Sequence, residues 1–371
     1  MKPLLFFIAA ALLAVPASCG AQPWVIETET GGIRVETVAS GLERPWAVAF
    51  LPDGRMLVTE RPGTLRILDA DNSLSEPLAG MPEVAASGQG GLLDVAIDPD
   101  FQSNRRVYFS FAEPGDGGAS TAVASGVLAE DGLEDVEVIF RQEPKVGGGN
   151  HFGSRLVFRG DGTLFVTMGD RFKFDPAQDI ANHIGAIARI NTDGSVPADN
   201  PFVGENSARP EIWSYGHRNV QGAALNPETG ELWAHEHGPR GGDEINIARA
   251  GENYGWPLVS MGEHYDGTPI PKPETRPQFA EAIHYWVPSI APSGMAFYNG
   301  ELFPEWRGDV LVGALVAQSL VRLSLDGQTV TNEERIALGA RIRDVDQGPD
   351  GAVYVVTDAS DGRILRLTPE Q

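Results

Sequence analysis

Residues 154–170 read SRLVFRGDGTLFVTMGD, two short apolar segments on either side of a turn rich in Asp and Gly. Each segment has the length of one strand, and the turn residues suit a β-hairpin. Self-similarity of this kind along a chain is the signature of a repeat fold. The pattern recurs as WAVAFLPDGRMLVTE from Trp46, LLDVAIDPDFQSNRRVYFSF from Leu92, GAALNPETGELWAHE from Gly222, SGMAFYNGELFPEWRGDVLVGAL from Ser293 and IRDVDQGPDGAVYVVTD from Ile342.

Further apolar strands follow several of the hairpins, such as TLRIL from Thr64, LVRLSL from Leu320 and RILRLTP from Arg363. Six repeats over about 330 residues leave about 55 residues each, the size of a four-stranded propeller blade with its loops. We therefore expect an all-β protein, a six-bladed β-propeller of four-stranded antiparallel sheets, in one domain over residues 33–369. An irregular pair of β-sandwiches is the alternative, and the likeness of the six hairpins disfavours it. Only residues 176–187 have a helical pattern.

The charge balance excludes several classes of partner. The chain has 371 residues, with 51 Asp and Glu against 28 Lys and Arg, and a formal net charge of −23. No run of basic residues is present, so neither nucleic acid nor an anionic lipid surface is an expected partner. The sequence indicates no oligomeric state.

The N-terminus has the pattern of a secretory signal over residues 1–21. An apolar run over residues 4–15 is followed by small residues, and it is too short to span a bilayer. The only cysteine, Cys19, ends the stretch PASC, which loosely resembles a bacterial lipoprotein cleavage site. The alternative is simple cleavage after Ala17 or Ala21. Both interpretations predict a periplasmic protein that does not span the membrane and has no disulfide. Under the first interpretation the protein is also lipid-anchored through Cys19.

The hairpins also predict which residues lie together. Residues that face each other across a hairpin have numbers with a constant sum, and this places His151 beside Asp170. In the next repeat, Arg218 faces Gly238. Corresponding positions of the repeats lie at one mouth of a propeller, where a polar pit is the expected ligand site. The residues at these corresponding positions are Gln89, His151, Asn219, Arg341 and Arg343.

His151 is a candidate general base. It follows three glycines at residues 147–149, which let a ligand approach the backbone closely. A facing carboxylate, here Asp170, would orient the imidazole and stabilise its protonated form. The alternative is a structural loop histidine, an interpretation that we favour for His183 and His284.

Arg341 and Arg343 are two residues apart, so on a strand they project from the same face. Two guanidinium groups on one face suit a polycarboxylate or a phosphate. Arg218 at the same rim strengthens this interpretation. The alternative is a pair of surface arginines that offset the excess of acidic residues.

The stretch HEHGPRGGDE from His235 is a candidate metal site. It lacks the spacing of a zinc protease motif, and its two histidines are more typical of strand ends than of metal ligands. The carbonyl groups of Gly238 and Pro239, with Asp243 and Glu244 nearby, offer hard oxygen ligands. Such ligands favour calcium over zinc.

Eight motifs occur together in one order: RPWAVAFLPDG from Arg44, GQGGLLDVAIDP from Gly88, GGNHFGSRL from Gly148, MGDR from Met168, YGHRNVQG from Tyr215, EHGPRGGDEIN from Glu236, NYGWP from Asn253 and RIRDV from Arg341. With these motifs the chain resembles the soluble quinoprotein glucose/sorbosone dehydrogenases, most closely their PQQ-dependent aldose sugar dehydrogenases. The resemblance covers almost all of the mature chain.

The resemblance implies a six-bladed propeller with PQQ in its central funnel above a calcium ion. It implies that His151 removes the proton of the anomeric hydroxyl, that Asp170 pairs with it, and that a hydride passes to PQQ, which converts an aldose sugar to its lactone. Arg218 is implied in catalysis and in cofactor binding. An external electron acceptor is also implied. The implied cofactor contacts are Gln89, His151, Arg218, Asn219, Arg341 and Arg343; the implied calcium residues are Gly238, Pro239 and Asp243, with Glu244 and Tyr254 at a second calcium position.

Two positions depart from the family pattern, since Val316 and Ala186 stand where the family usually has lysines. The first substitution removes a charged contact to PQQ. Two other functions remain open. One is a calcium-dependent sugar lactonase that uses His151 as a base toward water. The other is a non-catalytic binding propeller that has lost its cofactor.

Overall fold

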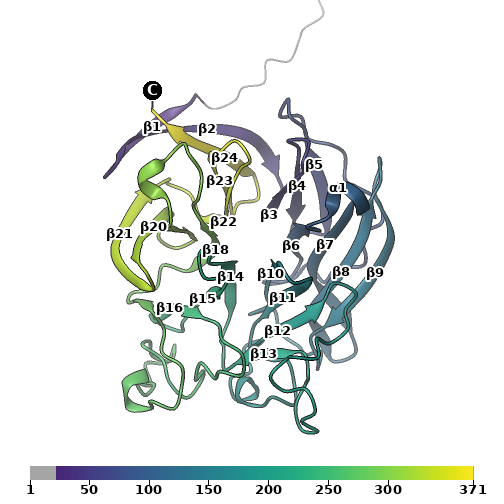
Figure 1. Ribbon diagram of the computed structural model, residues 1–371, viewed down its shortest axis with the longest axis vertical. Helices are drawn as coiled ribbons and strands as arrows, with labels where there is room; N and C mark the ends of the chain where they lie inside the picture. Colours follow the sequence, from purple (N-terminus) through teal and green to yellow (C-terminus); the bar gives the residue numbers. More distant parts are fainter. Residues whose placement is uncertain (1–21, 371) are drawn as a thin grey trace, which may run out of the picture.

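Six antiparallel β-sheets surround a central opening in the computed structural model, which describes residues 22–370 (Figure 1). The six-bladed all-β propeller is thereby confirmed. Five sheets follow one another along the chain: β3 (Pro45–Phe50), β4 (Met56–Glu60) and β5 (Thr64–Leu68); β6 (Leu92–Ile97), β7 (Arg106–Gly115), β8 (Gly118–Leu128) and β9 (Leu133–Arg141); β10 (Gly153–Arg159), β11 (Thr163–Met168), β12 (Ala186–Asn191) and β13 (Ile212–Tyr215); β14 (Val220–Leu225), β15 (Leu232–Glu236), β16 (Asp243–Ile247) and β17 (His284–Trp286); and β18 (Pro292–Phe297), β19 (Val310–Ala314), β20 (Ser319–Asp326) and β21 (Thr329–Ala337).

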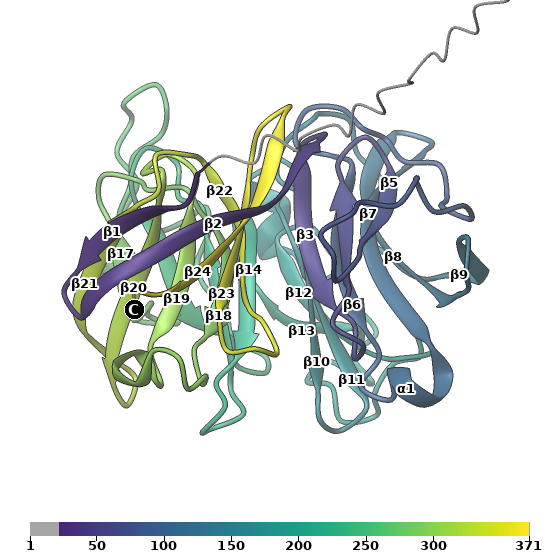
Figure 2. The ribbon, with the colours of Figure 1, turned by 90° about the horizontal axis from the view of Figure 1, so that it is seen from above.

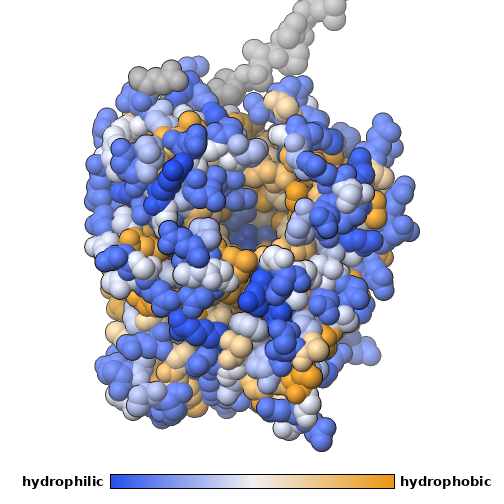
Figure 3. Space-filling view, viewed as in Figure 1, coloured by the Kyte–Doolittle hydropathy of each residue, from blue (hydrophilic) through white to orange (hydrophobic). Residues whose placement is uncertain are grey.

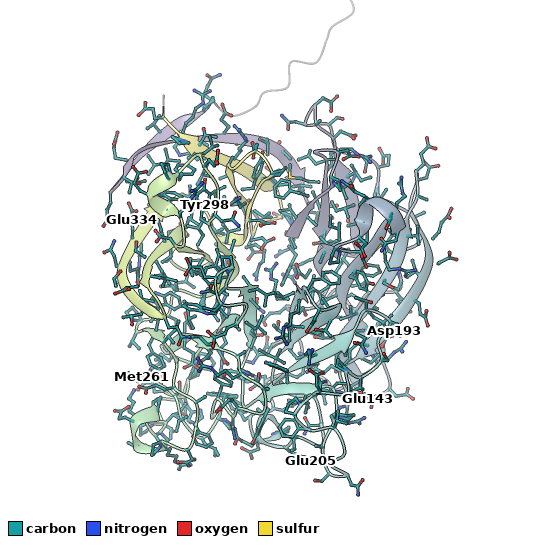
Figure 4. The ribbon with its side chains drawn as sticks, in the orientation of Figure 1. Glu143, Asp193, Glu205, Met261, Tyr298 and Glu334 are labelled. Carbon is teal, nitrogen blue, oxygen red and sulfur yellow. The ribbon has the colours of Figure 1, made fainter. Side chains whose placement is uncertain are left out.

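The sixth sheet closes the ring with strands from both ends of the chain. The C-terminal strands β22 (Ile342–Gln347), β23 (Val353–Thr357) and β24 (Gly362–Pro369) are completed by β2 (Gly31–Leu42), which pairs with β24. A fifth strand, β1 (Trp24–Thr28), pairs with β2 and crosses the outside of the neighbouring blade (Figure 2). There the amide of Glu29 donates to the carboxylate of Glu334 (2.6 Å). Glu334 lies on the outer strand β21 (Figure 4). The pairing of β2 with β24 thus joins the two ends of the chain in one sheet and closes the ring.

The blades pack face to face, and each apolar core lies between two neighbours. One core joins Trp46 and Leu57 of the first blade to Phe109 and Phe111 of the second. Another joins Ile33 of the closing strand to Trp306, next to the fifth blade. The innermost strands contact one another around the ring, and β22 returns to β3. Packing on both faces explains why these strands are apolar along most of their length.

Every inner hairpin carries a register shift near the start of its first strand. In the third blade the shift lies between Gly153 and Leu156, and it brings Gly153 opposite Met168. Such bulges redirect side chains and often occur beside active sites. Because all six lie at the same end of the blades, they shape one mouth of the central channel.

The predicted helix over residues 176–187 is wrong. Only the 3-10 turn Asp175–Gln178 forms, and β12 already begins at Ala186. Between them, Asp179 and Asn182 hydrogen bond to local backbone groups, and such turns compete with helix formation. The other helical segments are α1 (Phe101–Asn104) and the 3-10 turns Pro273–Thr275 and Pro304–Trp306.

No helix in residues 22–370 is long and apolar enough to cross a bilayer. The predicted signal over residues 1–21, with Cys19, lies outside the described residues.

Candidate active site

A cavity of about 600 Å³ opens at the bulged end of the central channel. Figure 3 shows the molecule from the opposite end of the channel, where the ring also has a central hollow. Arg44, Arg61, Arg341 and Arg343 line the cavity, with Asp358 as the one acidic side chain among the lining residues. The walls thus carry a local positive charge within a strongly acidic protein. Its remaining lining includes Trp46, Gln89, Leu93, Phe152, Gly153, Gln221, His237, Ala291 and Leu315.

His151 and Asp170 form a buried pair at the edge of this cavity. The distance between His151 Nδ1 and Asp170 Oδ1 is 2.6 Å, and both side chains are almost fully buried. The backbone amide of His151 donates to Gln89 Oε1 (2.7 Å), and Gln89 lines the cavity. The pairing expected from the hairpin spacing is therefore present, just beyond the bulge of β10.

The environment of His151 favours its neutral form. Burial lowers the pKa of His151 below its ordinary value, and Arg218 and Arg171 lower it further, while Asp170 opposes them. A neutral ring that donates from Nδ1 to Asp170 has a lone pair on Nε2. That arrangement is the one a general base requires.

The second oxygen of Asp170 is held by Trp256. The indole Nε1 donates to Asp170 Oδ2 (2.7 Å), and the backbone amide of Phe172 donates to Oδ1 (2.8 Å). The backbone amide of Asp170 donates to the carbonyl of Arg218. The carboxylate is therefore fixed on both oxygens, and the sequence reasoning did not identify Trp256.

Arg218 connects the pair to the rim of the site. Its guanidinium donates to the carbonyl of His237 (2.9 Å) and to the hydroxyl of Tyr265 (3.1 Å). It also lies 5.2 Å from the centre of the Trp256 ring. Arg218 and Asn219 do not line the cavity directly, but Asn219 accepts from the Gly153 amide at its wall (3.2 Å).

Arg341 and Arg343 both line the cavity, as their spacing predicts. Arg341 donates to Asp358 (3.1 Å), and Arg343 lies 3.5 Å from the same carboxylate. Arg343 also donates to Gln221 (3.0 Å), and burial lowers its pKa to about 10. The single carboxylate of Asp358 thus faces two guanidinium groups and can neutralise only one of them. The remaining positive charge is available to bind an anionic ligand.

Several buried donors around this site have no acceptor within the described residues. They are Nε of Arg61, Arg218 and Arg343 and Nδ2 of Asn219. An unsatisfied buried donor costs about 1–3 kcal/mol, so these groups favour a ligand that supplies acceptor oxygens. A polycarboxylate with quinone oxygens, such as PQQ, has that character.

A layer of buried ion pairs lies below the cavity. Arg155 pairs with Asp94 (2.8 Å) and Asp344 (3.0 Å), and its guanidinium lies 4.5 Å above the ring of Trp46. These three charged side chains line a second cavity, of about 580 Å³, at the other end of the channel. The layer therefore lies between the two cavities.

The candidate calcium residues fall into two groups. In the first, Asp243 is buried, and its carboxylate accepts from the backbone amides of Gly238 (2.9 Å), Ile290 and Ala291. These bonds hold the turn of Gly238 and Pro239 in place. Burial raises the pKa of the Asp243 carboxyl, and the three backbone donors oppose that rise.

In the second group, Glu244 faces Glu236 across β15 and β16. Burial and the carboxylate of Glu236 raise the pKa of Glu244. His217 hydrogen bonds to Glu236 (2.8 Å) and stacks on Tyr254, which joins Tyr254 to the cluster. Two adjacent carboxylates, Glu236 buried and Glu244 half-buried, fit a cation, but no group of three or more His, Cys, Asp or Glu side chains in residues 22–370 is arranged to hold a metal. A cation here would need backbone oxygens as well.

Both histidines of this segment are buried and lie apart from the candidate calcium residues in their bonding. His237 Nε2 pairs with the carbonyl of Pro292 (2.7 Å), and burial lowers its pKa well below the usual value. His235 is fully buried. His183 and His284 pair with Glu211 and Glu333.

The two departures from the family pattern lie in different surroundings. Val316 is 61% exposed and follows Leu315, which lines the cavity. Ala186 is buried at the start of β12. A basic side chain that the sequence reasoning missed, Arg61, lines the same cavity. Arg61 directly follows β4 in the first hairpin, and Asp170 follows β11 in the third hairpin at a similar position. The hairpin spacing could therefore have predicted that Arg61 lies at the same mouth of the channel.

Comparisons with known proteins identify the family of the chain. The family described as Glucose / Sorbosone dehydrogenase matches residues 42–366. The chain belongs to this family. Aldose sugar dehydrogenase YliI of Escherichia coli K12 is 49% identical over 345 residues, covering 91% of this chain and 93% of the relative.

Two solved structures place the fold in the same family. The apo form of the soluble aldose sugar dehydrogenase of E. coli has a TM-score of 0.87 and 46% identity, covering 91% of this chain and all of that one. The PQQ-bound aldose sugar dehydrogenase of Streptomyces coelicolor has a TM-score of 0.75 and 29% identity, covering 91% of this chain and 98% of that one.

Proposed function

We propose that the protein is a quinoprotein dehydrogenase that oxidises aldose sugars at the anomeric carbon to lactones. The observation that carries the proposal is the buried pair of His151 and Asp170 beside an arginine-lined cavity. The PQQ-bound relative and the relatives named aldose sugar dehydrogenase support it.

In this proposal, the chain holds the cofactor with the side chains around the cavity. Arg341, Arg343 and Arg61 provide charge for its carboxylates, and Gln89, Arg218 and Asn219 supply further polar contacts. Gly238, Pro239 and Asp243 would hold a calcium ion at the cofactor, and Glu244 with Tyr254 a second one. When bound, PQQ supplies an ortho-quinone that accepts the hydride, and a separate external carrier then takes the electrons.

The proton transfer belongs to the chain itself. His151 Nε2 removes the proton of the anomeric hydroxyl while Nδ1 stays bonded to Asp170. The Asp170 carboxylate stabilises the imidazolium that results, and Trp256 keeps that carboxylate in place. General-base catalysis of this kind typically contributes about 10²–10⁴-fold to the rate.

The cavity lining disfavours the two other functions. A neutral lactone needs no arginine-rich wall, and a propeller that has lost its cofactor has no reason to keep a fixed buried base. We also propose that the mature chain is exported to the periplasm, on the basis of the N-terminal sequence.

Reconstitution tests the function. The purified chain is mixed with PQQ and calcium and then given glucose and an artificial dye acceptor. Dye reduction that requires both additions supports the proposal, and His151→Gln should lose turnover while still binding PQQ. A folded protein that binds no PQQ, or that opens a sugar lactone without it, would contradict the proposal.

A further inference from the structure

Arg171 is a fully buried cation whose hydrogen bonds within residues 22–370 all go to backbone carbonyls. Its Nη2 donates to Gly148 (2.6 Å) and Ala119 (3.2 Å), and its Nη1 has no acceptor in the part of the chain that the structure describes. Burial lowers the pKa of Arg171 to about 10, and Asp170, its neighbour in the chain, opposes that effect. A buried charge without a bonded counter-ion is costly, so its presence at this point of the fold needs a reason.

Arg171 contacts the chain on both sides of His151. On one side it donates to the carbonyl of Gly148, three residues before the candidate base. On the other side its guanidinium lies 3.5 Å from the ring centre of Phe152, the residue that follows the base. Arg171 itself follows Asp170, the carboxylate bonded to His151. One side chain therefore joins the segment that carries the base to the segment that carries its partner.

The two segments that Arg171 joins have strained backbones. His151, Arg171 and Phe172 have φ values of 56°, 50° and 59°, in the left-handed region that bulky side chains avoid. Such conformations persist only where surrounding contacts enforce them, and they cluster at functional sites. Residues 147–149 before His151 are glycines, which add no side-chain contacts of their own. The bond from Arg171 to Gly148 supplies a restraint that this segment otherwise lacks.

Three charged side chains act on His151. Burial lowers the pKa of His151 most, the hydrogen bond with Asp170 raises it, and the charges of Arg218 and Arg171 lower it further. The other elements near the ring are residues 85–91 and 147–150, which carry no titratable side chain, and Phe172, beyond which lie His264 and Tyr265.

The two arginines differ in what can neutralise them. Arg218 donates to the hydroxyl of Tyr265, which is exposed, so it lies where an anionic ligand can reach it. Arg171 is fully buried and does not line the cavity, so a ligand there does not meet its guanidinium. The charge of Arg171 beside His151 therefore persists whether or not the cavity is filled.

We propose that Arg171 is a positioning residue for His151: it holds the base against Asp170 and keeps a fixed positive charge beside the imidazole. The inference rests on the proposed function and names a further residue that supports the same base. The fixed charge disfavours protonation of the free ring, so the base stays available in mildly acidic surroundings. Asp170 stabilises the imidazolium once the proton has been taken, so the two neighbours act on His151 in opposite directions.

The first test follows kcat/KM for glucose against pH in the PQQ-loaded protein with calcium and a dye acceptor. Arg171→Gln removes the charge and should raise the midpoint of the acid limb by about 0.5–1 pH unit, opposite to Asp170→Asn. It should also lower kcat about tenfold, because the segment of the base loses a restraint. Arg171→Lys keeps the charge but lacks the forked guanidinium, so its midpoint should stay near that of the wild type while kcat still falls.

The matched control is Arg322→Gln in the fifth blade. Arg322 is also a buried arginine over an aromatic ring, that of Trp306, and it pairs with Asp309 and Glu334. Its removal should leave the midpoint of the acid limb unchanged, because no contact joins it to His151 in the described residues. A midpoint shift common to Arg322→Gln and Arg171→Gln would overturn the proposal.

A second measurement needs neither turnover nor cofactor. NMR of the protein with ¹³C-labelled histidine follows the protonation of each ring with pH, and the signal missing from His151→Gln belongs to His151. Its midpoint should rise in Arg171→Gln and stay near the wild-type value in Arg171→Lys. If Arg171→Gln does not fold, Arg171→Lys decides: a lower kcat at an unmoved midpoint supports the proposal, and an unchanged kcat overturns it.

The outcomes separate this inference from the proposed function. If the wild-type protein does not oxidise glucose, the proposed function fails, and the NMR midpoint alone decides whether Arg171 acts on His151. If the wild-type protein is active and folded Arg171→Gln loses kcat without any change of midpoint, Arg171 has a structural role only and the proposal fails.

Discussion

Trp256 Nε1 lies 2.7 Å from Asp170 Oδ2, the carboxylate oxygen that His151 does not use. Both residues are buried, so no water replaces the indole readily. Trp256 belongs to a loop far along the chain from the third blade, and it fixes the orientation of the carboxylate that in turn fixes His151. It is a positioning residue for the proposed base.

Trp256→Phe should therefore lower kcat by about tenfold with a smaller effect on KM, because a buried acceptor left without its donor costs about 1–3 kcal/mol. Steady-state kinetics of the reconstituted protein measure both constants. The matched control is Trp213→Phe, which removes an indole bond to the carbonyl of Ala248 (2.8 Å) away from the site. An equal loss of kcat in the two variants would mean that only general stability was affected.

The pH dependence follows from the lowered pKa of His151. Above that pKa the ring is neutral and can accept a proton, so kcat/KM should be constant; it should fall as the pH drops through a midpoint below 6.5. Asp170 raises the pKa of His151, so Asp170→Asn should move this midpoint to lower pH and also reduce the maximal rate. A midpoint above the ordinary histidine value in the wild-type protein would show that burial does not dominate.

The hairpin pattern predicted the parts of the site that lie within single blades. His151 and Asp170 flank one hairpin. Arg341 directly precedes β22 and Arg343 lies within it, so spacing along the chain relates each pair. Trp256 meets Asp170 through contacts between distant segments, which no local spacing encodes. The pairing of β2 with β24 likewise joins the two ends of the chain.

The failed helix has a different cause. Residues 176–187 contain helix-forming residues, but Asp179 and Asn182 satisfy the local backbone through their own side chains. Local propensity favours a helix over these residues. The hydrogen bonds of the Asp179 and Asn182 side chains to the backbone, together with the start of β12, prevent one from forming.

Calcium should stabilise the protein through the facing carboxylates of Glu236 and Glu244. A cation removes the repulsion between these carboxylates, and any ligand that binds only the folded state raises the melting temperature. Thermal denaturation after chelator treatment, with calcium or magnesium added back, should show a higher Tm with calcium. Glu244→Gln should reduce that rise, whereas Glu333→Gln, which affects a pair with His284 outside the cluster, should not. An identical calcium effect in Glu244→Gln would place the stabilising ion elsewhere.

Arg61 should take over part of the role that the missing lysine has in the family. Its Nε is buried without an acceptor beside the cavity, whereas Val316 is exposed. Arg61→Gln should weaken PQQ binding by about tenfold or more, since a hydrogen bond to a charged group contributes about 1.5–3 kcal/mol. Quenching of tryptophan fluorescence by PQQ measures this, with Arg34→Gln, at an exposed side chain of β2, as the control. Val316→Lys should tighten binding. If it does so only in the Arg61→Gln background, the two cations serve the same carboxylate; if it has no effect in either, the backbone at residue 316 lies too far from the cofactor.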